Sequence, residues 1–232
     1  MKVIAIDTST EYLALGISED QRILSAQKIL LERKHSTDLL PILEKTLKKL
    51  RLSIRGIDGF IVGLGPGSFT GLRVGISIVK VMAVALGKPI VGVPTLDCLA
   101  EAAPGEGDRV APLVDAKRQQ VYAALYERKN GFLRKKISEN VIPPETFLKT
   151  LGGKTLFVGD GALLYRETIQ RVLGNNANFT DAAYDSPNPS TLLRLGLKQF
   201  EKKCLEDPRT LVPLYLYPKN CMIIGTVPHK HP

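Results

Sequence analysis

Short apolar runs separated by polar turns alternate along the first hundred residues with stretches of helical spacing. The runs have the length and the β-branched or aromatic composition of strands, which are predicted at residues 2–7, 12–18, 22–30, 60–64 and 89–93. Leucine and isoleucine recur at helical spacing over residues 35–50, and helices are also predicted at 76–86 and 95–102. This order of strands and helices indicates an α/β fold.

The pattern breaks at residues 103–108, which read Ala-Pro-Gly-Glu-Gly-Asp and form the predicted boundary between two lobes. The order then starts again, with strands at 110–115, 121–127, 132–142 and 156–159 and a helix at 163–173. Both halves open with a strand that ends in aspartate, a polar turn and two more strands, which suggests a duplication. We divide the chain into an N-terminal lobe, a C-terminal lobe, a helix that packs back across a lobe and an extended tail, at residues 1–103, 104–190, 191–206 and 207–232.

The segment Gly65–Gly75 places four glycines and a proline where a buried strand must turn into a helix. It is not a Walker A loop, because Leu72 follows Gly71, and its glycine spacing is one residue too long for a dinucleotide fingerprint. Two readings stay open: a helix N-terminus that attracts an anion, and a sharp turn with close helix packing. Gly71 and Gly75 continue a four-residue period, so they predict a smooth strip facing either the chain's own sheet or a partner.

Composition places the chain among ordinary globular proteins, with 232 residues, 44% hydrophobic residues and no low-complexity block. Its three cysteines, Cys98, Cys204 and Cys221, are widely separated, which argues against a disulfide framework or a zinc knuckle. The apolar run 76–86 is interrupted by Lys80 and is too short to cross a bilayer. The N-terminus has a strand pattern instead of a signal peptide, so we expect a soluble cytoplasmic protein without membrane contact.

Two aspartates suggest a site for metal–phosphate chemistry. Asp7 and Asp115 end comparable strands of the two halves, so they are predicted to face a common cleft, where they would suit metal–phosphate chemistry. Acids at strand ends also cap turns, so this alternative stays open.

The formal net charge of +9 would attract nucleic acid or an acidic protein. Basic residues cluster at 33–34, 45–55, 117–118, 128–136 and 198–203. Lysines on helix surfaces are commonly just solvated, and aromatic residues are not expected to be interleaved with these clusters as base stacking requires.

Five motifs in the same order resemble the TsaB family, also called YeaZ. They are Ala5–Thr10, His35-Ser36 ahead of Leu39–Pro41, Gly65–Gly75, Val114–Arg118 before Val121-Tyr122, and Pro213–Leu216. The resemblance covers most of the chain, and the long glycine segment is its most specific part. It implies an actin-like, sugar-kinase and Hsp70 (ASKHA) fold with two ribonuclease-H-like lobes.

The resemblance also implies a role in making N6-threonylcarbamoyladenosine at tRNA position 37, as a subunit that pairs with the catalytic paralogue TsaD and helps recruit the ATPase TsaE. The paralogue holds its metal through a His-x-x-x-His motif, whereas here His35 is followed four residues later by Leu39. One imidazole anchors a metal poorly, so we expect no catalytic residue, no metal and no peptidase activity. The tail histidines His229 and His231 also make a poor metal site.

A nucleotide site is expected to be eroded. No cofactor is expected, and at most weak binding of ATP with magnesium. The residues that would form such a residual site are Asp7, Thr8, Ser9, Thr10, Asp115, Gly159 and Gly161.

We expect function through contact, with helix 35–50 and the helix starting near Phe69 docking on TsaD, and tRNA met through the complex. The expected contact residues are His35, Leu39, Leu43, Leu47, Gly71, Gly75 and Met82. The same patch could join two copies of an isolated chain. Two alternatives stay open: a kinase-like enzyme that binds ATP and Mg²⁺ with Asp7 and Asp115, and a direct tRNA-binding module that uses Lys117, Arg118 and residues 128–136.

Overall fold

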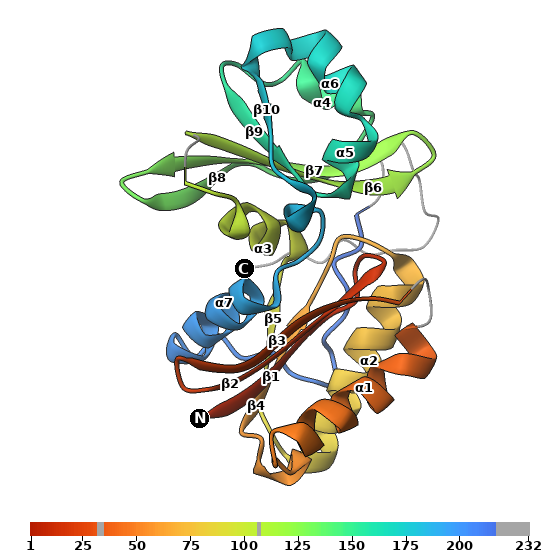
Figure 1. The fold of residues 1–232 in the computed structure, drawn as a ribbon, viewed down its shortest axis with the longest axis vertical. Coiled ribbons are helices and arrows are strands. Elements are labelled where there is room, and N and C mark those ends of the chain that lie inside the picture. The colour runs from red at the N-terminus through yellow and green to blue at the C-terminus, as the bar shows by residue number, and fades with distance from the viewer. Residues whose placement is uncertain (32–34, 106–107, 217–232) are drawn as a thin grey trace.

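The computed structural model describes residues 1–31, 35–105 and 108–216, with His35 described by its backbone alone. The chain forms two lobes, each built on a five-stranded sheet (Figure 1). The N-terminal sheet has the order β3-β2-β1-β4-β5. Its strands are β1 (Lys2–Asp7), β2 (Tyr12–Glu19), β3 (Arg22–Leu30), β4 (Gly59–Gly63) and β5 (Ile90–Val93).

The C-terminal sheet repeats this arrangement with the order β8-β7-β6-β9-β10. In each sheet the first three strands pair antiparallel, and the fourth pairs parallel to the first. The strands are β6 (Arg109–Lys117), β7 (Gln120–Lys129), β8 (Phe132–Ile142), β9 (Thr155–Val158) and β10 (Ala177–Phe179). This repetition confirms the predicted pair of ribonuclease-H-like lobes and hence the ASKHA fold.

Helices α1 (His35–Lys49) and α2 (Phe69–Leu86) cover one face of the N-terminal sheet. The apolar run 76–86 belongs to a helix that starts at Phe69, as expected. The Ser68 side chain caps this helix by accepting a hydrogen bond of 3.2 Å from the backbone N–H of Gly71. Leucines of α1 fill the core beneath them. The expected partner contacts Leu39, Leu43 and Leu47 are buried there, and Met82 is partly buried against the same core.

The C-terminal sheet carries α4 (Pro144–Leu148), α5 (Asp160–Leu164) and α6 (Arg166–Leu173) on one face. The helix predicted at 163–173 is thus two helices that meet at Tyr165. Short 3-10 turns lie at Ile54–Gly56, Gly174–Asn176 and Ala182–Tyr184.

The last helix of each half packs on the sheet of the other half. The helix α3 (Thr95–Ala102) follows β5, yet its leucines pack against residues of β6, β7 and β9. The helix α7 (Pro189–Glu201) follows β10 and packs on β1, β4 and β5 (Figure 1). An ion pair of 3.0 Å between Arg194 and Glu101 joins the two helices. A second ion pair, 2.5 Å from Lys28 to Asp185, joins β3 to the segment that leads into α7.

The segment 207–216 runs along α2. The Lys80 ammonium donates to the carbonyl of Leu211 at 2.7 Å, and the amide of Leu214 donates to the carbonyl of Leu64 at 2.8 Å. Leu211 is buried in the N-terminal core. His229 and His231 lie outside the described residues.

The glycine strip faces the turn between β1 and β2. A Cβ atom added to Gly71 would lie 2.1 Å from the carbonyl oxygen of Thr8, and one added to Gly75 would lie 2.2 Å from its hydroxyl. On β4, a Cβ on Gly63 would lie 2.0 Å from the carboxylate of Asp7. The sequence left open whether this strip faces the chain's own sheet or a partner. In the structure the β1–β2 turn of the same chain occupies it. The structure therefore corrects the expectation that Gly71 and Gly75 contact a partner, because both are buried against that loop.

Candidate functional site

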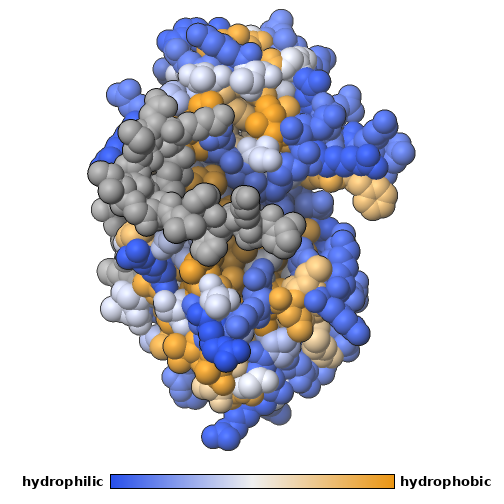
Figure 2. Space-filling view, turned by 180° about the vertical axis from the view of Figure 1, so that it is seen from behind, coloured by the Kyte–Doolittle hydropathy of each residue, from blue (hydrophilic) through white to orange (hydrophobic). Residues whose placement is uncertain are grey.

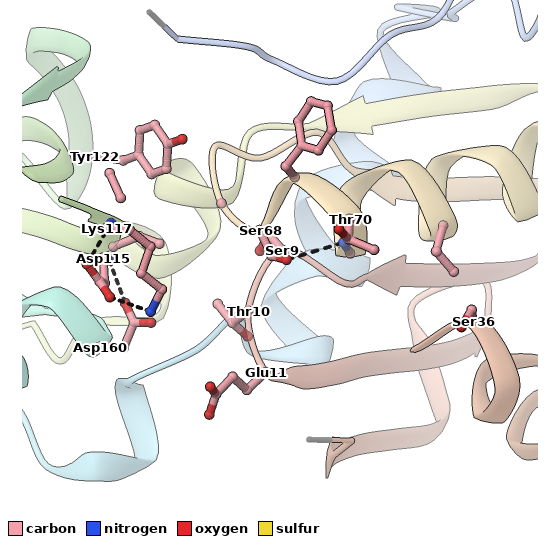
Figure 3. A pocket seen from close by; sticks show the side chains of 16 residues that line it. Ser9, Thr10, Glu11, Ser36, Ser68, Thr70, Asp115, Lys117, Tyr122 and Asp160 are labelled. Carbon is pink, nitrogen blue, oxygen red and sulfur yellow. Dashed lines mark hydrogen bonds and ion pairs between the residues drawn. The ribbon is translucent and has the colours of Figure 1, made fainter. Parts of the chain in front are cut away.

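A pocket of about 610 Å³ lies between the lobes (Figure 3). Its N-terminal wall comes from the β1–β2 turn and the first turn of α2, and its C-terminal wall comes from β6, β7 and α5. Both lobes thus contribute polar side chains to one space. The lining residues are Ser9, Thr10, Glu11, Ser36, Gly67, Ser68, Phe69, Thr70, Gly71, Val74, Val114, Asp115, Ala116, Lys117, Tyr122 and Asp160.

The two aspartates predicted to face a common cleft have different positions. Asp7 is 1% exposed and is not among the lining residues. Its carboxylate accepts hydrogen bonds from the backbone N–H of Ser9 at 2.7 Å and from the hydroxyl of Thr95 at 2.9 Å. Asp7 therefore holds the β1–β2 turn together beneath the pocket, and only Asp115 lies on the pocket wall.

Asp115 is paired with a lysine of its own strand. Its carboxylate lies 2.6 Å from the Lys117 ammonium and accepts a second hydrogen bond of 2.8 Å from the Lys117 backbone N–H. This hydrogen-bonded carboxylate raises the pKa of the Lys117 ammonium. In Figure 3 both side chains lie beside Asp160, across the pocket from Ser9, Thr10 and Glu11.

Asp160 is a pocket residue that our reasoning from the sequence missed. Its carboxylate accepts a hydrogen bond of 3.1 Å from the backbone N–H of Asp115. Burial raises the pKa of Asp160 to about 6, although backbone hydrogen bonds from Asp115 and Gly161 act in the opposite direction. The signal that could have revealed it is an acid between two glycines directly after a buried strand.

Those two glycines, Gly159 and Gly161, bring α5 close to β6. A Cβ on Gly159 would lie 2.3 Å from the carbonyl oxygen of Leu113, and Gly159 has a φ of +100°, which favours glycine. A Cβ on Gly161 would lie 2.9 Å from the same residue. The glycines expected to approach a nucleotide thus pack against the sheet.

The first turn of α2 opens into the pocket at Ser68, Phe69 and Thr70. Among the described residues, the backbone amides of Phe69 and Thr70 meet no protein acceptor. These amides keep the anion reading of the glycine segment open, beside the close packing described above.

The acids around the pocket fit Mg²⁺ with a nucleotide poorly. Both Asp7 oxygens are engaged within the fold, and Asp115 is paired with Lys117. Glu11, Asp115 and Asp160 face the space with one ammonium group among them, so unneutralised phosphates would be repelled. Within residues 1–31, 35–105 and 108–216, no cluster of three His, Cys, Asp or Glu side chains could hold a metal ion.

A second candidate site is the outer face of α1 and α2. Six of the 18 residues of α2 are buried, although the helix is apolar and long enough by length and composition to span a membrane. Its exposed side carries Val81 and Val84, which are 67% and 58% exposed, and α1 adds Leu40 at 50%. On the side of the molecule seen in Figure 2, apolar side chains are interspersed with charged ones on the lower, N-terminal lobe. The residues that α1 and α2 offer to a partner therefore differ from the buried leucines named above.

The start of α2 and the tail form an aromatic–cationic cluster at the edge of this face. The Arg73 guanidinium lies 3.7 Å from the centre of the Phe69 ring and donates a hydrogen bond of 3.0 Å to the hydroxyl of Tyr215. The two rings are 5.6 Å apart. Stacking of this kind stabilises an exposed arginine and fixes the tail on the helix.

Comparison with known proteins shows the family. A family profile described as "TsaD: tRNA N6-adenosine threonylcarbamoyltransferase" matches residues 27–224. The chain is 32% identical over 219 residues to the tRNA threonylcarbamoyladenosine biosynthesis protein TsaB of Bacillus subtilis, covering 93% of this chain and 94% of the relative. It is 34% identical over 167 residues to TsaB of Escherichia coli, covering 69% and 72%. The solved structure of YeaZ from Pseudomonas aeruginosa has a TM-score of 0.79 and 29% identity, covering 93% of this chain and 99% of that chain.

Two lobes of repeated topology with a pocket between them define an α/β protein of the ASKHA class. The chain belongs to the family that the threonylcarbamoyltransferase profile describes and, within it, to the TsaB (YeaZ) proteins. Its role is in the biosynthesis of threonylcarbamoyladenosine in tRNA.

Proposed function

We propose that this chain is the non-catalytic partner subunit of the assembly that forms N6-threonylcarbamoyladenosine at tRNA position 37. In this proposal it pairs with TsaD through the outer face of α1 and α2, helps recruit TsaE and meets tRNA through the complex. It acts in the cytoplasm.

The observation that carries the proposal is the exposed apolar side of α2. Leaving Val81 and Val84 in water forgoes roughly 1.5–3 kcal/mol for each side chain that a partner would bury completely. Leu40 on the neighbouring helix α1 is half exposed as well. The Phe69–Arg73–Tyr215 cluster adds an aromatic and cationic rim, a combination enriched at protein interfaces. An isolated chain would use the same face to form a homodimer.

Lack of catalysis is supported by the position of Leu39. A second histidine of a His-x-x-x-His pair would stand there on α1, but the site is occupied by a leucine in the apolar core. The side chain of His35 lies outside the described residues. Asp115 and Asp160 of the interlobe pocket are engaged with the chain's own groups, which favours a supporting role for them.

The test of this proposal is the affinity of the full chain for a purified TsaD subunit, measured by calorimetry. The double variant Val81→Glu/Val84→Glu should weaken association at least about 30-fold, because charges would enter the apolar centre of the contact and hot spots contribute 2 kcal/mol or more. Leu205→Glu is the matched control, since Leu205 is also exposed and apolar but lies outside α1 and α2. Unchanged affinity of the double variant, or equal weakening by the control, would refute the proposed interface.

The proposed role is tested separately by tRNA modification. The chain alone should add no threonylcarbamoyl group to tRNA, and addition of the other subunits should restore formation of the product. Product formed by the purified chain alone would overturn the non-catalytic role.

A second candidate, a kinase-like function with ATP and Mg²⁺, is favoured only by the interlobe pocket and the open amides of α2. Asp115 is the acid that such a nucleotide would meet. Magnesium-dependent ATP binding that is lost in Asp115→Asn would support this candidate in place of the first.

A further inference from the structure

The end of the C-terminal sheet away from the interlobe pocket presents a basic hairpin. Strands β7 and β8 meet there in a two-residue turn, Asn130-Gly131, with φ values of 53° and 78°. In Figure 1 this turn lies on the left of the upper lobe, whereas α1 and α2 lie at the lower right. The hairpin end is therefore separate from the face proposed for the partner subunit.

Cations outnumber acids on this hairpin. The residues from Tyr126 to Ile137 include Arg128, Lys129, Arg134, Lys135 and Lys136 but only one acid, Glu127. Lys135 is engaged with Asp97 at 2.8 Å, and Lys136 lies 3.2 Å from Glu127. Within the described residues Lys129 and Arg134 form no ion pair, and both are exposed. They are thus available to an anionic partner.

The same end of the sheet holds a second pocket, of about 560 Å³, that extends the basic surface. Arg109 and Lys154 lie on its wall together with Asp108 and the backbone of Gly152 and Gly153. Arg109 also lies 3.4 Å from Glu127, so this single carboxylate sits between Arg109 and Lys136. The pocket and the hairpin are therefore joined into one surface with an excess of positive charge.

An exposed aromatic ring lies within this surface, so the expectation that no aromatic residue is interleaved with the basic clusters is wrong at this hairpin. Phe132 begins β8, the edge strand of the sheet, and is 72% exposed. It pairs with Lys129, and Arg134 lies two residues further on the same strand, so all three share one face of the hairpin. Figure 2 shows a largely hydrophilic projection from the side of the upper lobe with an apolar side chain at its edge. An exposed ring beside cations offers a platform on which a base can stack.

We propose that the β7–β8 hairpin end binds an unpaired segment of RNA. The phosphates lie against Lys129, Arg134 and the basic pocket around Arg109 and Lys154, while one base stacks on Phe132. A flexible single strand suits this surface, because a base must be unstacked to reach an aromatic ring. The proposal rests on the role of the chain in tRNA modification, and it gives the chain a direct contact with the substrate of the assembly. Lys117 and Arg118, at the opposite end of β6, take no part in it.

The experiment measures binding of a fluorescently labelled tRNA transcript to the full chain, alone and assembled with TsaD, over a series of salt concentrations. Lys129→Ala/Arg134→Ala removes two phosphate contacts, so the slope of log K against log salt should become less steep by about 1.4. Phe132→Ala removes stacking, so affinity should fall about 5- to 150-fold with the slope unchanged. Lys198→Ala/Lys202→Ala, with two exposed lysines at the end of α7, is the control for net charge.

Three outcomes would overturn the proposal. Wild-type affinity and salt slope in the hairpin variants would show that RNA does not bind there, and an equal loss in the control would show a non-specific charge effect. Hairpin variants that lose poly-glutamate binding, with no effect of Phe132→Ala on RNA, would assign the surface to an acidic protein instead. Assembly with TsaD, measured on the same samples, decides the proposed function independently, because all five substituted residues lie outside α1 and α2.

Discussion

The hydroxyl of Thr8 donates a hydrogen bond of 2.7 Å to the carbonyl oxygen of Gly71 and so ties the β1–β2 turn to the first turn of α2. Both groups are buried, and the absence of a side chain on Gly71 permits the approach. The contact sets the position of the N-terminal pocket wall, because Ser9, Thr10 and Ser68 are neighbours of these two residues.

Replacing this glycine should destabilise the fold. In an open helix Gly→Ala stabilises by about 1 kcal/mol, but the Cβ of Gly71→Ala would lie 2.1 Å from the backbone oxygen of Thr8. We expect a net loss of about 1–3 kcal/mol in the free energy of unfolding, measured by urea denaturation. Gly56→Ala is the control, since nothing lies within 4 Å of its added Cβ. A Gly71→Ala protein as stable as the wild type would contradict the packing described here.

Asp160 predicts a pH dependence of stability. Burial raises its folded pKa to about 6 from an ordinary value of 3.8, so the folded state holds the proton more tightly than the unfolded state. Its contribution to stability is therefore present below about pH 4 and is lost as the pH rises through 6. Asp160→Asn keeps an oxygen that can accept from Asp115, so the variant should gain on the order of 2 kcal/mol over the wild type at pH 7.5 and almost nothing at pH 3.5.

Urea denaturation at several pH values measures this difference between variant and wild type. Asp207→Asn is the control. Hydrogen bonds from Arg209 lower the pKa of Asp207, so the change in stability of this variant with pH should have the opposite sign. A difference between Asp160→Asn and the wild type that does not change between pH 3.5 and 7.5 would show that the buried carboxyl does not titrate in this range.

Leu193 anchors α7 on the N-terminal sheet, although it lies late in the chain. It is 1% exposed, and its side chain occupies the space above Gly16 of β2, where an added Cβ would lie 2.8 Å away. Leu193→Ala should lower the free energy of unfolding by about 2–5 kcal/mol. Leu205→Ala, at an exposed leucine, should change it by less than about 0.5 kcal/mol. Equal effects of the two substitutions would mean that α7 is not part of this core.

The sequence predicted the strands well, because the apolar runs of central strands such as β1, β2 and β4 are buried on both faces and bounded by turn residues. It missed β10, whose three residues are too short to form a pattern. The expected helix start near Phe69 is confirmed, since α2 begins at Phe69 and Ser68 caps its first turn. The repeated order of strands was visible from the start because it needs only local patterns.

The sequence was less informative about which side chains face outward. Leu39 and Leu40 are adjacent and chemically equal, yet one is buried and the other is half exposed. Hydrophobicity alone does not distinguish a core face from a docking face, and Leu39, Leu43 and Leu47 of the expected contacts lie on the buried side of α1. Asp7 and Asp115 likewise end equivalent strands, but Thr95 of a distant helix engages only the first. Such long-range partners leave no local pattern.

The exchange of α3 and α7 makes the two halves of the duplication dependent on each other. A cut between residues 103 and 108 would leave the first sheet without α7 and the second without α3, so each fragment would expose an apolar face that its own residues cannot cover. Neither half is then a free-standing module. The same crossed packing of α3 and α7 connects the two lobes on either side of the interlobe pocket.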